Sequence, residues 1–142
     1  MKIRLSQIAF DGSEFNDSID PKTLDLDTDV IHFLGPLAVK AEVSRITNAV
    51  LVKVLLTGKV ELICSRCLQP IKTDLHKEVA LTYMVEPRDL SLDLDPDIRE
   101  ELILDYSINP LCSATCKGLC PRCGKNLNEG GCTCAITKTK TF

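Results

Sequence analysis

The sequence predicts an α+β fold: a curved antiparallel β-sheet of about four or five strands, one packed helix and a cysteine-rich C-terminal module. Three observations lead to this prediction. Apolar and polar residues alternate through the middle of the chain, one helical pattern follows, and six of the eight cysteines lie within residues 112–134. A chain of 142 residues fits one domain. We expect residues 1–111 to form the sheet body and residues 112–142 to form a tail packed on it.

Three segments show the period-two alternation of a strand with one buried face. They are residues 37–46, 49–64 and 71–85. "RITNA", which ends at Ala49, has the composition of a hairpin turn between the first two. Gly58 indicates a bulge or a bend in the long second strand. The positions expected to face the core are Leu37, Val39, Ala41, Val43, Val50, Val52, Val54, Leu56, Val60, Leu62, Ile71, Leu75, Val79, Leu81, Tyr83 and Val85.

The segments that flank these strands have less regular patterns. Residues 2–8 can add an edge strand to the sheet. Residues 11–28 and 86–95 are polar and acidic, and this composition favours loops.

A single helix is expected near residues 96–108, which read "PDIREELILDYSI". Asp95 is the expected N-cap, and Pro96 suits the first helical position. Pro110 ends the helix, because proline cannot donate a backbone hydrogen bond. The apolar stripe expected to pack on the sheet consists of Ile98, Leu102, Ile103 and Tyr106.

The redox environment decides how the cysteines are interpreted. The first residues, "MKIRLSQIAFDGSEF", contain no apolar run of signal-peptide length, and no segment approaches the roughly 20 apolar residues of a membrane span. We therefore expect a cytoplasmic protein whose thiols stay reduced, which favours metal ligation over disulfides. A disulfide framework, an iron–sulfur cluster and redox thiols are the alternatives.

"CPRCG", residues 120–124, is the sharpest local motif. A CxxC pair places two thiolates one tight turn apart, close enough to share one tetrahedral zinc ion. Gly124 permits a positive φ, so backbone N–H groups can turn toward the sulfurs. "CTC" follows after eight residues rich in turn formers and supplies two more thiolates. The predicted four-cysteine zinc module comprises Cys120, Cys123, Cys132 and Cys134, and a cluster of buried, unligated cysteines is the alternative.

The remaining cysteines suggest a second site. Cys64 and Cys67 form a CxxC between two predicted strands, which is half of a zinc knuckle. Cys112 and Cys116 directly follow the predicted helix. Joining the two pairs gives a second four-sulfur site that ties the hairpin tip to the end of the helix. Two alternatives stay open: Cys116 can exchange roles with Cys120, or one site can form with spare thiols.

Neither predicted site resembles a catalytic zinc centre, which usually has three protein ligands and an open position. Here every ligand would be sulfur and the shell would be closed. His32 and His76 lie on strand-like segments far from the cysteines, where ordinary surface or core roles are expected. The sequence contains no HExxH motif, no Gly-rich phosphate loop and no Ser/His/Asp order. We therefore expect no catalytic residues and no enzyme activity.

Larger motifs resemble a known family. They are "CSRCLQP" at residues 64–70, the acidic helix, and "LCSATCKGLCPRCGKNLNEGGCTC" at residues 111–134. Together they resemble the YceD family, the bacterial and plastid large ribosomal RNA subunit accumulation proteins. The resemblance covers residues 60–134, and "CKGLCPRCGKNLN" is its most specific part. It implies a non-enzymatic factor for large-subunit rRNA processing or accumulation, with precursor rRNA or an assembly intermediate, and ribosomal proteins, as partners.

Two other functions remain open on the sequence. The first is a zinc-stabilised protein–protein adaptor or regulatory protein without RNA contact, which an exposed apolar patch without a basic face would favour. The second is a thiol oxidoreductase, which metal-free cysteines with a lowered pKa would favour.

The charge distribution selects the candidate RNA-binding residues. Residues 1–111 carry 12 Lys and Arg against 19 Asp and Glu, a charge of −7, whereas residues 112–142 carry 5 against 1, a charge of +4. Aromatic residues make up only 4% of the chain, so contacts to phosphates are expected rather than base stacking. The alternative is that these lysines only keep the tail soluble. The expected contacts are Lys117, Arg122 and Lys125 between the cysteines, with smaller contributions from Lys138 and Lys140.

Overall fold

The computed structural model describes residues 1–105 and 109–134, which form two compact units. The first, here called the sheet unit, comprises Met1–Leu62 and Lys72–Ser107. The second, here called the cysteine unit, comprises Ile63–Ile71 and Ile108–Phe142. Tyr106, Lys138 and Lys140 lie outside the described residues. The predicted division into a body and a packed tail stays a prediction.

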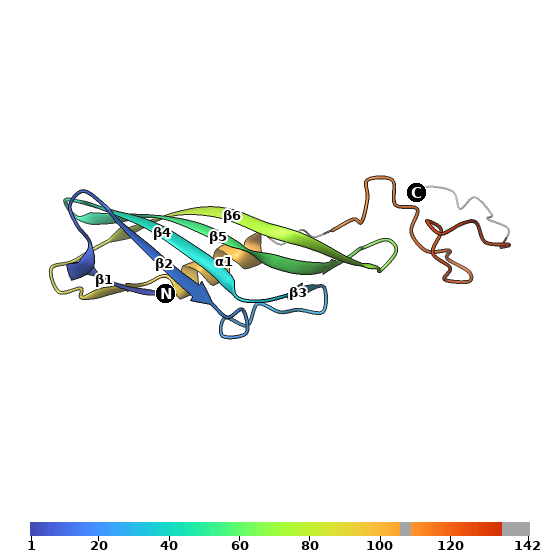
Figure 1. Cartoon of the computed structure of the whole chain (residues 1–142), viewed down its shortest axis with the longest axis horizontal. Helices are drawn as coiled ribbons and strands as arrows, with labels where there is room; N and C mark the ends of the chain where they lie inside the picture. Colours follow the sequence, from blue (N-terminus) through green and yellow to red (C-terminus); the bar gives the residue numbers. More distant parts are fainter. Residues whose placement is uncertain (106–108, 135–142) are drawn as a thin grey trace. The chain divides into compact units, whose positions relative to one another are not determined.

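The sheet unit is built mainly from antiparallel strands (Figure 1). Its main sheet has five strands in the order β2-β4-β5-β3, with β6 also paired to β5. A separate antiparallel pair joins β1 to β7. The predicted antiparallel sheet with one α-helix is confirmed for the described residues, and the curvature of the sheet stays a prediction. The elements are β1 (Lys2–Arg4), the 3-10 turn η1 (Leu5–Gln7), β2 (Ser13–Ile19), β3 (Ile31–Phe33), β4 (Leu37–Ile46), β5 (Ala49–Ile63), β6 (Pro70–Met84), β7 (Ser91–Asp93) and α1 (Asp95–Leu104).

The core of this unit forms on the face of the sheet that carries the predicted apolar positions of β4 and β5. The antiparallel register places Val39 opposite Leu56 and Val43 opposite Val52, so their side chains leave the same face of the sheet. These positions are almost fully buried, as alternation with a period of two requires. Helix α1 completes the core with Ile98 and Leu102, and Leu94, the residue before the helix, is also buried there.

Two segments predicted as loops are strands. Residues 13–19 form β2, and Ser91–Asp93 form β7. β2 pairs with β4 at the edge of the sheet and exposes most of its side chains, so its sequence lacks the apolar alternation of a half-buried strand. β7 has three residues, too few to show a period, and it buries only Leu92.

The predicted last residues of helix α1, 106–108, lie outside the described residues, whereas its N-cap is Leu94 and not Asp95 as predicted. The helix begins at Asp95 and its described part ends at Leu104, with Asp105 as the C-cap. An acidic side chain at this end opposes the helix dipole, so Asp105 is a poor residue for extending the helix. Tyr83 donates a hydrogen bond to Asp97 on the helix, which fixes α1 to β6. No helix among residues 1–105 and 109–134 has the length and apolarity needed to span a membrane.

Gly58 has a packing role within β5. β5 pairs with β4 up to Thr57 and with β3 from Val60 onward, so Gly58 lies where the partner strand changes. A Cβ atom at this position would lie 2.5 Å from Cδ2 of the fully buried Leu37. The structure therefore explains this glycine by a close approach of β4 rather than by a special backbone conformation.

We predict that Gly58→Ala lowers the free energy of unfolding by about 1–3 kcal/mol, because the added methyl group overpacks against Leu37. Gly35→Ala is the matched control, since a Cβ there meets nothing within 4 Å. The control is expected to change stability by less than about 1 kcal/mol. Urea unfolding followed by far-UV circular dichroism measures both, and equal stability of the two variants would contradict the packing role.

Candidate metal centres

The eight cysteines gather in two groups of four within the cysteine unit. The first site consists of Cys64, Cys67, Cys112 and Cys116, and the second site consists of Cys120, Cys123, Cys132 and Cys134. Within each group the four sulfur atoms lie within 4.8 Å of one another. This grouping is the one expected from the sequence, with Cys116 in the first site and Cys120 in the second. That the sites bind metal stays a prediction.

The first knuckle is the turn between β5 and β6. The backbone N–H of Cys64 donates to the carbonyl of Gln69 at 2.9 Å, and the N–H of Leu68 donates back to the carbonyl of Cys64 at 3.0 Å. Leu68 adopts a φ of 60°, a left-handed conformation that costs a non-glycine residue about 1–2 kcal/mol. The turn holds the sulfurs of Cys64 and Cys67 within 4.8 Å of each other.

The second knuckle, residues 120–125, repeats this hydrogen-bond pattern. The N–H of Cys120 donates to the carbonyl of Lys125 at 2.8 Å, and the N–H of Gly124 donates to the carbonyl of Cys120 at 2.9 Å. Gly124 has a φ of 72°, which confirms the positive φ that the sequence predicts for it. Glycine carries no strain in this conformation, whereas Leu68 does at the equivalent position of the first knuckle. Two segments with different sequences therefore form the same turn.

Each knuckle directs backbone N–H groups at its first sulfur. Hydrogen bonds from the N–H of Cys67, and secondarily of Arg66, lower the pKa of Cys64 to about 6. Those from Cys123 and Arg122 lower the pKa of Cys120 to about 6. Such N–H groups stabilise the thiolate, which is the form that ligates metals. The turns are therefore organised to hold negative charge on sulfur.

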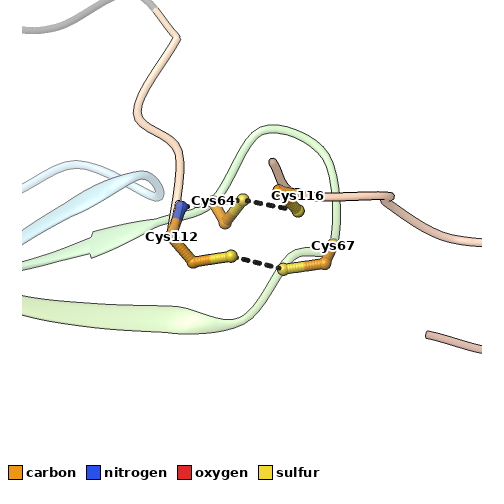
Figure 2. Close-up of side chains that lie close together, drawn as sticks. All are labelled: Cys64, Cys67, Cys112 and Cys116. Carbon is orange, nitrogen blue, oxygen red and sulfur yellow. Dashed lines mark hydrogen bonds between the residues drawn. The ribbon is translucent and has the colours of Figure 1, made fainter. Parts of the chain in front are cut away.

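The first site joins two segments that are distant in the sequence (Figure 2). The sulfur of Cys64 lies 3.8 Å from that of Cys116, and the sulfur of Cys67 lies 3.6 Å from that of Cys112. The N–H of Cys112 points to the sulfur of Cys64 at 3.4 Å. Arg66 adds a further link, because its Nη1 donates to the carbonyl of Cys116 at 3.0 Å. Three of the four cysteines are buried, and Cys112 is exposed.

The second site is local in sequence and more open to solvent. The sulfurs of Cys120 and Cys132 lie 3.3 Å apart. Cys120 is buried, Cys123 is exposed, and the other two cysteines are half-buried. A side-chain hydrogen bond with Cys123, followed by burial and by repulsion from a Cys123 thiolate, raises the pKa of Cys134 to about 12. A cation bound among the four sulfurs would remove this repulsion.

The sulfur separations fit a tetrahedral metal site. A zinc–sulfur bond of about 2.3 Å gives an edge of about 3.8 Å between the corners of an ideal tetrahedron. Three of the separations are 3.3–3.8 Å, which is close to this edge and far from the roughly 2.05 Å of a disulfide bond, and all of them lie within 4.8 Å. Four-sulfur sets suit zinc or iron–sulfur centres. Both groups can therefore hold a metal ion, with all four positions taken by protein ligands.

Asn128 connects the first site to the loop of the second, and sequence reasoning missed it. Its side-chain Nδ2 donates to the sulfur of Cys116 at 3.3 Å, and its Oδ1 accepts the N–H of Lys117 at 2.8 Å. The amide of Asn128 is the largest cause of a lowered pKa at Cys116. In the sequence, Asn128 lies within "GKNLNEGG" and is interpreted only as a turn former.

The predicted RNA-binding side chains lie on the surface of the cysteine unit. Lys117, Arg122 and Lys125 are all exposed. The Nζ of Lys125 donates to the carbonyl of Gly131 at 3.2 Å, which ties this side chain to the loop of the second site. The two histidines, at positions 32 and 76, are exposed residues of β3 and β6 and belong to neither cysteine group.

Comparison with known proteins agrees with the motifs. Residues 84–142 match the sequence model of a family described as "Large ribosomal RNA subunit accumulation protein YceD". The resemblance to the YceD family is confirmed over this stretch. It includes α1, the whole second site, and the Cys112 and Cys116 pair of the first.

Two curated relatives match shorter stretches of the chain. The chloroplastic YCED homolog 1 of Arabidopsis thaliana is 38% identical over 48 residues, which cover 34% of this chain and 15% of the relative. The corresponding protein of Zea mays is 40% identical over 47 residues, covering 32% and 16%. The matched part therefore spans about one sixth of each relative's length. No solved structure matches this chain.

We predict that Cys64→Ser removes one metal ion from the chain and lowers its thermal stability, because a structural zinc contributes roughly 10 kcal/mol or more of binding free energy that exists only in the folded state. Native mass spectrometry should count two ions in the unaltered protein, one for each cysteine group, and one in the variant. Ser65→Ala, which changes the adjacent exposed side chain, should keep both. An unchanged metal count and melting temperature in Cys64→Ser would rule out the first site.

Proposed function

We propose that this protein is a non-enzymatic, zinc-binding factor for large-subunit ribosomal RNA processing or accumulation, and hence for ribosome biogenesis. The observation that supports this most is the match of residues 84–142 to the YceD family. Both plant relatives are named for large ribosomal RNA subunit accumulation. The proposed location is the cytoplasm, while the relatives are described as chloroplastic.

Zinc is the proposed metal at both sites, with all eight cysteines as ligands. A closed four-thiolate shell is typical of structural zinc, which would act as a crosslink. In the first site the crosslink would join the β5–β6 turn to residues 112–116. In the second it would close the loop between Cys123 and Cys132. The chain's own part is to hold the sulfurs as thiolates through the N–H groups of the two knuckles.

The proposed partner is precursor large-subunit rRNA or a ribosomal assembly intermediate, with ribosomal proteins as further partners. Lys117, Arg122 and Lys125 follow or flank metal-ligating cysteines, so the folded cysteine unit would hold their charges in place. Each zinc with four thiolates carries a charge of −2, which offsets much of the basic charge of this unit. Contact with phosphates would therefore depend on where these three side chains project rather than on net charge.

Depletion of the protein is expected to lower mature large-subunit rRNA relative to small-subunit rRNA, because the proposed role concerns one subunit only. Quantification of both rRNAs after depletion measures this ratio. Re-expression of the unaltered chain should restore it. A ratio that stays constant, or an equal loss of both rRNAs, would contradict the proposed function.

Changing Lys117, Arg122 and Lys125 together to Gln should weaken binding to precursor rRNA and flatten its salt dependence, because each lost phosphate contact removes about one unit of log–log slope. Zinc content should stay the same. The matched control changes three exposed lysines of the sheet unit to Gln and so removes the same charge: Lys22, Lys59 and Lys72. Salt-titrated binding assays compare the two variants. An identical slope in both would exclude the proposed basic contacts.

One observation favours a second candidate, a zinc-stabilised protein–protein adaptor without RNA contact. The sheet unit exposes Phe10, Met84 and Leu90, with 88%, 77% and 82% of each residue accessible. Apolar side chains this exposed are common at protein interaction sites when they lie together. A Phe10→Ser, Leu90→Ser variant that loses function while the triple Gln variant keeps it would favour the adaptor.

A further inference from the structure

The loop between Cys123 and Cys132 belongs to the second site by sequence, yet it also contacts the first. It comprises residues 124–131 and is here called the linking loop. Asn128, near its middle, donates its side-chain N–H to the sulfur of Cys116 at 3.3 Å. Glu129 accepts a hydrogen bond from Nε2 of Gln69, in the first knuckle, at 3.2 Å. Both contacts lie within the cysteine unit.

The position of Asn128 is fixed from both sides. Its own N–H donates to Oδ1 of Asn126 at 3.0 Å, and its Oδ1 accepts the N–H of Lys117 at 2.8 Å. The N–H of Leu127 donates to the carbonyl of Gly118 at 2.9 Å. These bonds orient the side-chain amide of Asn128 so that one N–H points to a sulfur of the first site. Asn128 thus donates a hydrogen bond to Cys116, a predicted ligand of the first site, although its own loop lies between two cysteines of the second site.

Both ends of the linking loop are ligands of the second site. A metal bound there would hold Cys123 and Cys132 together and so reduce the conformational freedom of the residues between them. The loop would then present the amide of Asn128 to Cys116 without a further entropic cost. When the first metal ion orders the loop, the second ion binds without that entropic cost. This is positive coupling between the two sites, and it is equal in both directions.

We propose that Asn128 couples the two metal sites, so that metal in the second site raises the affinity of the first, and the reverse. This proposal rests on the metal-binding part of the proposed function and is independent of RNA. Loss of an outer-shell hydrogen bond to a ligand typically weakens metal affinity 10–100-fold. About a tenfold coupling is therefore expected from a single N–H donor.

The two sites can also be coupled through the backbone, and the test has to separate this coupling from coupling through Asn128. Cys116 and Cys120 are joined by only three intervening residues, so metal at one site can also influence the other through the backbone. Coupling through the backbone would survive removal of the Asn128 side chain, whereas coupling through its amide would not. A double-mutant cycle measures this difference.

The experiment uses the full chain loaded with zinc and titrated with a chelator of known affinity. Thiols released at each chelator concentration are alkylated and located by peptide mass spectrometry, which gives a separate zinc affinity for each site. The cycle combines Asn128→Ala with a Cys132→Ser, Cys134→Ser pair that disables the second site. Far-UV circular dichroism verifies that the sheet unit stays folded in every variant. Glu129→Gln, one residue along the loop, is the matched control and retains an acceptor for Gln69.

Disabling the second site should weaken zinc binding at the first about tenfold when Asn128 is present and less than about twofold in Asn128→Ala. Asn128→Asp, which retains the acceptor for Lys117 but lacks the N–H donor, should behave like the alanine variant, and Glu129→Gln like the unaltered chain. Two sites that bind zinc independently, or a coupling that persists in Asn128→Ala, would overturn the inference. A chain that binds no zinc would instead overturn the proposed metal-binding function itself.

Discussion

The cysteine unit depends on bringing four sulfur atoms together at one point, because it has little else to hold it together. Among its described residues the buried cluster consists of Cys64, Cys67 and Cys116, with Ile71, Leu111 and Leu119 packed against them. Apolar burial on this scale cannot offset the conformational entropy of ordering such a short unit, and units of this size usually need metals or disulfides. The sheet unit has no such need, since it buries a continuous set of aliphatic side chains.

This difference determines how charged side chains are held in the two units. In the sheet unit the backbone is fixed by strand pairing, and its charged side chains lie on an exposed face or along edges. In the cysteine unit the same residues that would bind metal also fix the backbone. Lys117 follows Cys116 directly, and Arg122 precedes Cys123. The positions of the basic side chains, and the alignment of Asn128 with Cys116, therefore depend on the cysteine sites.

Much of the sheet could be predicted from the sequence, for a physical reason. β4 and β5 bury one face and expose the other, so burial imposes alternation on their residues, and the turn before Ala49 is marked by its composition. β2 could not be predicted in this way, because an edge strand that buries Ile19 and half-buries Phe15 carries no such pattern. The N-cap of α1, Leu94, was also missed, because it makes no side-chain capping hydrogen bond and is not a residue type typical of a cap.

In the cysteine sites, the ligating residues could also be predicted from the sequence, whereas the residues that support them could not. CxxC spacing predicts which sulfurs lie on one turn, and exclusion of the assigned cysteines leaves few pairings for the rest. The residues that support the sulfurs are different. Leu68 takes a conformation typical of glycine, and Arg66 and Asn128 act on Cys116 from 50 and 12 residues away. Spacing in the sequence holds no information about such contacts, because they arise only once the turn, residues 112–116 and the loop have folded together.

X-ray absorption spectroscopy at the zinc edge, on protein purified with its native metal, tests the central claim most directly. Two closed four-cysteine sites predict a first shell of about four sulfur atoms at about 2.3 Å, with no nitrogen or oxygen neighbours, and two ions per chain. A mixed sulfur and oxygen shell around zinc, or purified protein that shows no zinc edge, would contradict the claim that zinc crosslinks organise the cysteine unit.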